Sequence, residues 1–107
     1  MLLLFEHEDA YTNFSAEDMQ KEIEIHGKWI EELGEHFDSG EPLEHPAKSV
    51  RGKEKLVTDG PFIEAKELVS GFYIIKAESL EQATELSKGC PVLRLGGSIE
   101  VREVMAM

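Results

Sequence analysis

The sequence predicts one α+β domain over residues 1–107, with elements in the order strand, helix, hairpin, strand, helix, strand. Three features predict this order: a helical apolar stripe early in the chain, a turn-rich middle, and a strongly β-forming run after it. Each helix can cross over the sheet in the right-handed sense that such connections prefer. We therefore expect a sheet that is covered by two helices on one face.

The first third of the chain predicts a strand and a long helix. Residues 2–5 are continuously apolar, as in a short buried strand. Ser15 and Asp18 resemble a capping box, so we expect the helix to begin at about Ala16 and Gly40 to stop it. Its apolar residues recur every four or three positions, which places them on one face of the helix. This face comprises Met19, Ile23, His26, Ile30, Leu33 and Phe37, and is widened by Ile25 and Trp29.

The rest of the chain predicts shorter elements separated by strong turn signals. Two prolines in residues 41–47 predict an irregular crossing segment, and a glycine-containing turn between two short runs predicts a hairpin. The richest β-forming run is the best candidate for a central strand. The expected elements are hairpin strands at 48–50 and 55–58, a central strand within 69–77, a helix capped by Ser79 and Gln82 and ended by Gly89 and Pro91, and a last strand at 98–104.

The composition and charge of the chain argue against nucleic acid and membranes as binding partners. Eleven Lys and Arg against 22 Asp and Glu give a net charge of -11, which would repel nucleic acid and anionic membrane surfaces. No apolar run approaches the roughly 18 residues of a membrane helix. The single Cys90 cannot form an internal disulfide, and the first residues lack the pattern of a signal peptide, so we expect a cytoplasmic location. The acidic surface could instead meet a protein partner.

A sheet covered on one side leaves its other face exposed. The predicted strands are rich in Leu, Phe and Ile, so this second face would be apolar. Such a face favours pairing with a second copy, with the carboxylates at the rim of the interface. The sequence therefore predicts a homodimer.

One segment carries a family resemblance. Residues 56–67 read Leu-Val-Thr-Asp-Gly-Pro-Phe-Ile-Glu-Ala-Lys-Glu, which resembles the L-V-T-D-G-P-F-x-E-x-K-E signature of DGPF proteins in the YCII-related family. Residues 31–33, 71–75 and 97–102 also resemble the family pattern. The resemblance implies a ferredoxin-like βαββαβ fold with an extra hairpin strand, in the dimeric α/β barrel group, with a cleft beside the sheet. It implies no agreed substrate, although some relatives are suspected of acid–base work by a His and Asp pair.

The candidate catalytic residues are His26 and Asp59. His26 interrupts an apolar helical stripe, where burial or a carboxylate can move its pKa, and Asp59 could fix the tautomer of its ring. The alternative is that His26 fills the edge of the core while Asp59 caps its own turn. Four further residues are candidates for ligand binding, against the alternative of a solvated loop and surface ion pairs: Glu64, Lys66, Tyr73 and Arg102.

No cofactor or metal is expected. The four histidines are too scattered for metal-ligand spacing, and no cysteine pair exists. The common phosphate-binding, dinucleotide-binding and hydrolase signatures are missing from the sequence. Two functions remain: a non-catalytic or regulatory protein that binds a small polar ligand near the Asp59 turn, or a small-molecule enzyme that uses His26 and Asp59 as an acid–base pair.

Overall fold

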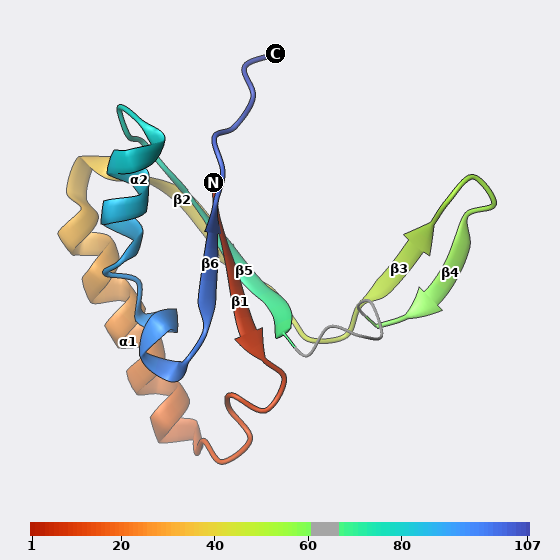
Figure 1. Cartoon of the computed structure of the whole chain (residues 1–107). Coiled ribbons are helices and arrows are strands. Elements are labelled where there is room, and N and C mark those ends of the chain that lie inside the picture. Colours follow the sequence, from red (N-terminus) through yellow and green to blue (C-terminus); the bar gives the residue numbers. More distant parts are fainter. Residues whose placement is uncertain (61–66) are drawn as a thin grey trace.

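The computed structural model describes residues 1–60 and 67–107 and shows an α+β chain (Figure 1). Two short 3-10 turns, η1 and η2, accompany the helices and strands. The elements are β1 (Leu2–His7), α1 (Ala16–Leu33), η1 (Gly34–His36), β2 (Phe37–Pro42), β3 (Lys48–Arg51), β4 (Leu56–Asp59), β5 (Glu67–Ile75), α2 (Leu80–Ser87), η2 (Pro91–Leu95) and β6 (Ser98–Val101).

Four strands form one antiparallel sheet in the order β2-β5-β1-β6. This order is compatible with a ferredoxin-like fold, and β5 is an inner strand, as the sequence predicts. Among the described residues, strands β3 and β4 pair with each other in a separate two-stranded sheet. In Figure 1 both helices lie on one side of the four-stranded sheet and the β3–β4 hairpin lies on the other. Among the described helices, none is both long and apolar enough to cross a membrane.

The core lies between α1, η2 and the inner face of the sheet. Strand β1 alternates, so that Leu2 and Leu4 point inward while the residues between them point outward. The buried hydrophobic residues from all three layers pack in one cluster: Leu2, Leu4, Trp29, Leu33, Tyr73, Cys90 and Val92. Burial raises the pKa of the Cys90 thiol to about 11, so this cysteine stays protonated as part of the core.

The predicted end of the first helix is wrong. The helix stops at Leu33, because Gly34 takes a φ of 56° and turns the chain out of the helical path. Phe37–Pro42 then forms the edge strand β2, which pairs with β5. Gly40 does not end a helix. It lies opposite Tyr73 in this strand pair, where the missing side chain leaves room for the tyrosine ring.

The buried stripe of α1 also differs from the predicted one. Glu22, Trp29 and Leu33 are buried and His26 is half-buried, whereas Ile23 is 62% exposed. The stripe is rotated by about one residue because the large Trp29 ring faces the sheet and Glu22 has a cationic partner below the helix. The predicted face is therefore right at Trp29 and Leu33, wrong at Ile23, and incomplete without Glu22.

The local signals at the helix starts and at the hairpin turn are confirmed. Ser15 and Asp18 form both hydrogen bonds of a capping box, and the Ser79 side chain caps α2. The hairpin forms where it was predicted, and Gly52 in its turn has a φ of 68°. These features depend on neighbouring residues alone, which explains why the sequence predicts them well.

Two glycines should respond in opposite directions to replacement by alanine. A Cβ at Gly40 would lie 2.6 Å from Tyr73 Cδ1, so Gly40→Ala should destabilise the fold by about 1–3 kcal/mol through overpacking. Gly27 lies inside α1, where a Cβ would meet no atom within 4 Å beyond the backbone of the helix itself. Gly27→Ala should therefore stabilise the fold by about 0.5–1 kcal/mol. Urea unfolding measures both, and equal effects of the two changes would contradict the described packing of β2 on Tyr73.

Candidate functional site

The structure does not bring His26 and Asp59 together within one chain. His26 lies on α1, and its Nδ1 is 2.8 Å from the hydroxyl of Tyr73. Asp59 ends β4 on the hairpin, where its Oδ1 accepts a hydrogen bond of 2.7 Å from Lys48 Nζ. Figure 1 shows β4 and α1 well separated, on opposite sides of the sheet. Each residue of the predicted pair therefore has another partner, and their joint catalytic role remains a prediction.

Tyr73 lies at the centre of the helix–sheet interface. Its ring meets Trp29 edge-on with the centroids 5.1 Å apart, and meets Phe37 edge-on at 6.3 Å. Burial raises the pKa of its hydroxyl to about 12, so the phenol keeps its proton at neutral pH. This proton can be donated to Nδ1 of His26.

His26 is held mainly as a neutral ring. Desolvation lowers its pKa below the ordinary 6.5, while the carboxylates of Glu22 and Glu6 act in the opposite direction. A neutral ring that accepts at Nδ1 carries its proton on Nε2. The pair formed with Tyr73 is therefore an uncharged hydrogen-bonded pair at neutral pH.

Two buried carboxylates lie near this pair and were not predicted. Glu22 of α1 forms an ion pair with Arg94 of η2, and Glu6 is buried on the inner face of β1. Each carboxylate has an Oε2 atom that is buried without a hydrogen-bond partner among the described residues. Burial and a hydrogen bond to Glu6 raise the pKa of Tyr11 well above its ordinary value. Together with the His26–Tyr73 pair, these groups form one polar cluster under α1: Glu6, Tyr11, Glu22, His26, Tyr73 and Arg94.

The sequence carried a signal for both carboxylates. Glu6 continues the alternation of Leu2 and Leu4 toward the inner face, and Glu22 lies one helical turn before His26 and two before Trp29. Acidic side chains are almost always solvated, so residue type alone assigns both to the surface. Only the position of Arg94 beneath the helix shows why Glu22 is tolerated there.

Of the remaining predicted ligand residues, the structure describes Arg102. Arg102 follows β6 on the surface, and its Nη1 is 3.6 Å from Glu100 Oε2 in an exposed ion pair. Glu64 and Lys66 lie outside the described residues. Within the described ranges, no three His, Cys, Asp or Glu side chains converge as metal ligands would.

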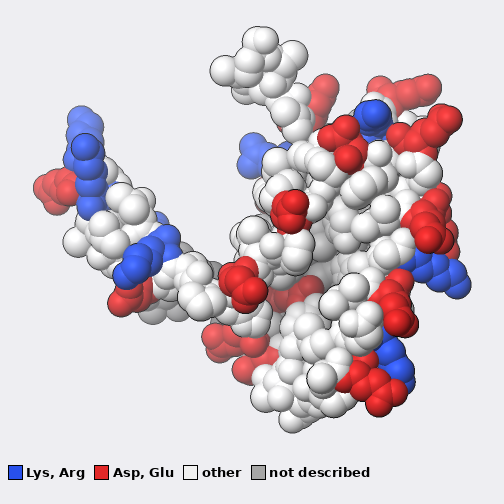
Figure 2. All heavy atoms as spheres, turned by 180° about the vertical axis from the view of Figure 1, so that it is seen from behind, with Lys and Arg blue, Asp and Glu red and all other residues white. Residues whose placement is uncertain are grey.

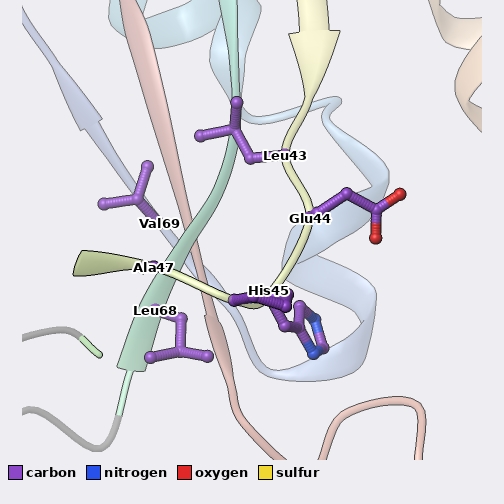
Figure 3. Close-up of a pocket in the computed structure, with 7 residues that line it drawn as sticks. Leu43, Glu44, His45, Ala47, Leu68 and Val69 are labelled. Carbon is purple, nitrogen blue, oxygen red and sulfur yellow. The ribbon is translucent and has the colours of Figure 1, made fainter. Parts of the chain in front are cut away.

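A hollow of about 480 Å³ lies where the hairpin leaves the sheet (Figure 3). Figure 3 shows Leu43 turned toward Val69 of β5, while the Glu44 side chain points away from them. The backbone N–H of Gly60 donates a hydrogen bond of 2.7 Å to the carbonyl of Ala47, so Gly60, the residue after β4, lies beside this hollow. Its lining is mainly apolar, with one histidine and one carboxylate: Leu43, Glu44, His45, Pro46, Ala47, Leu68 and Val69.

The lowered pKa of His26 has a consequence for stability. The unfolded chain binds a proton at His26 below about pH 6.5, whereas the folded chain resists it, so the free energy of unfolding should fall as the pH drops through this range. His26→Gln should remove this part of the fall. Urea unfolding at several pH values between about 5 and 7.5 measures it, and parallel profiles for the two proteins would contradict the desolvated position of the ring.

Comparison with known proteins agrees with the resemblance to the YCII-related family. The family model of the YCII-related domain matches residues 1–107. No match to the chain is found among the curated proteins. Since the family match spans far more than half of the sequence, the chain belongs to the YCII-related domain family.

Proposed function

We propose that this chain is a homodimeric, non-catalytic protein that binds a small ligand in the hollow beside the Asp59–Gly60 turn. The observation that carries the proposal is the hollow itself, in which apolar side chains form the walls and His45 supplies a hydrogen-bonding group. The hollow lies where the hairpin joins the sheet, so a bound ligand could change the position of the hairpin, as a regulatory role requires.

The chemistry of the hollow limits the ligand. Leu43, Pro46 and Val69 suit an apolar portion, whereas His45 suits a polar group. Glu44 and the net charge of -11 disfavour an anion. The best match is a small neutral or cationic polar molecule with an apolar part.

The enzyme alternative has one observation in its favour. His26 is half-buried and neutral at neutral pH, which suits a general base, although its Nδ1 lone pair is occupied by the hydroxyl of Tyr73. Neither His26 nor Asp59 lines the hollow, however, and Asp59 is paired with Lys48. Acid–base work by the predicted pair would require Asp59 to reach His26 from a second copy. For either function, the proposed ligand contacts remain Glu64, Lys66, Tyr73 and Arg102.

The homodimer rests on the outer face of the four-stranded sheet. The inward residues belong to the core, whereas Leu3, Phe5, Phe72 and Ile74 point the other way and lie outside the buried cluster. Val69 extends this outer face and is 43% exposed. An apolar sheet face of this kind suits face-to-face pairing with a second copy, as in the dimeric α/β barrel group.

Ligand binding is tested with a thermal-shift screen of small neutral and cationic compounds. A ligand at 100 times its Kd should stabilise the wild-type protein by about 2.7 kcal/mol. Leu43→Asp should abolish the shift, while the control Leu80→Asp, at a similarly exposed leucine on α2, should retain it. Undiminished binding by Leu43→Asp would reject the hollow as the site.

The enzyme alternative is tested on the same compounds. If NMR shows that the protein converts one of them to a product, the enzyme alternative is favoured over the non-catalytic protein.

The homodimer is tested by light scattering at micromolar concentration. Wild type should have twice the chain mass, and Phe72→Asp should weaken dimerisation by more than about 100-fold because it places a charge in a desolvated face. Ile23→Asp, at a 62% exposed position on α1 across the sheet from this face, should leave the dimer intact. A monomeric wild-type protein, or a dimeric Phe72→Asp variant, would overturn the proposed pairing.

A further inference from the structure

The β3–β4 hairpin projects from the body of the molecule. Residues 48–59, named the arm from here on, form their own two-stranded sheet, and Figure 1 shows this sheet extending away from the side that carries the helices. The radius of gyration of the chain is 15.3 Å, whereas a compact chain of this length has about 13 Å. The arm therefore reaches into the space where a second copy on the outer sheet face would lie.

The arm exposes large apolar side chains on both of its faces. Val50 and Val57 lie directly opposite each other on one face of the arm and are 66% and 55% exposed, and Leu56 on the other face is 61% exposed. A two-stranded hairpin alone in water is marginally stable at best and needs a further apolar surface to pack against. The arm thus has the properties of a segment that is covered in the assembled protein.

The charge of the arm is opposite to that of the body. It carries four of the 11 Lys and Arg residues but only two of the 22 Asp and Glu residues, which gives it a formal charge of +2 and leaves -13 on the rest of the chain. Figure 2 shows lysine and arginine atoms prominent on the arm and carboxylates distributed over the body. Two bodies with this charge repel each other, and an arm placed between them reduces the repulsion.

We propose that the arm of each copy docks on the acidic body of the other copy within the homodimer, an inference that rests on the homodimer proposed above. The Val50–Val57 face supplies the apolar contact, and the lysines of the hairpin turn, Lys53 and Lys55, lie against carboxylates of the second copy. The arrangement is reciprocal, since a two-fold axis gives each body one arm to receive. A second copy is favoured over an unrelated protein because the chain itself carries both complementary charges.

The electrostatic part is tested by matched charge reversals. The double change Lys53→Glu and Lys55→Glu on the arm should weaken the dimer about tenfold and reduce its sensitivity to salt between about 50 and 300 mM. The control reverses two exposed lysines of α1, Lys21→Glu and Lys28→Glu, and so changes the net charge equally. It should shift the dimer Kd by less than about twofold. Sedimentation equilibrium measures all three proteins.

The contact itself is tested by photocrosslinking. With p-benzoylphenylalanine in place of Val57, irradiation of the purified protein should give a crosslinked species of twice the chain mass, and peptide mapping should place the link on the body of the second copy. A link confined to one chain, or no link in the purified protein, would overturn arm docking.

Different experimental results would reject arm docking and the homodimer on which it rests. A dimer that is disrupted by Phe72→Asp but is equally tight in the arm variant and its control would reject arm docking and leave the sheet-to-sheet pairing standing. A monomeric wild-type protein would reject both.

Discussion

The ring of Tyr73 holds the first helix and the edge strand on the same sheet. It comes from the inner strand β5, meets Trp29 of α1 on one side, and lies against Gly40 and Phe37 of β2 on another. Large aromatic side chains bury much apolar area, and edge-on contacts add to that burial. The position of α1 and the path of the chain after it both depend on the space that this ring occupies.

The same ring brings polar groups into the interface. Its hydroxyl requires a partner once it is buried, and His26 provides one at 2.8 Å. Around the pair lie Glu6 and the Glu22–Arg94 ion pair, so the space beneath α1 is far more polar than an apolar stripe predicts. Removing one partner from such an ion pair is more harmful than replacing both, because it leaves a buried charge uncompensated. The polar cluster therefore constrains how α1 can be seated on the sheet.

The arm and the hollow share one end of the sheet. The hollow is formed by the segment that leads into β3 and by the first residues of β5, and Gly60, the residue after β4, donates a hydrogen bond to Ala47 in its lining. A ligand in this hollow would contact the root of the arm, and in the proposed homodimer the arm contacts the second copy. The two proposals therefore meet at one junction, through which a bound ligand would act on dimerisation.

By itself, the sequence determined the features that depend on neighbouring residues and on composition. The capping box at Ser15, the hairpin turn at Gly52, the inner strand around Tyr73 and the family signature were all readable, because local backbone preferences and short motifs act over a few residues. Only the tertiary structure decided that Glu22 is buried on α1 while Ile23 is exposed, and that Phe37 begins a strand. It also decided that His26 bonds Tyr73 while Asp59 bonds Lys48. These outcomes depend on contacts between side chains that are far apart in the sequence. The spacing of residues along the chain does not show which of them will pack together.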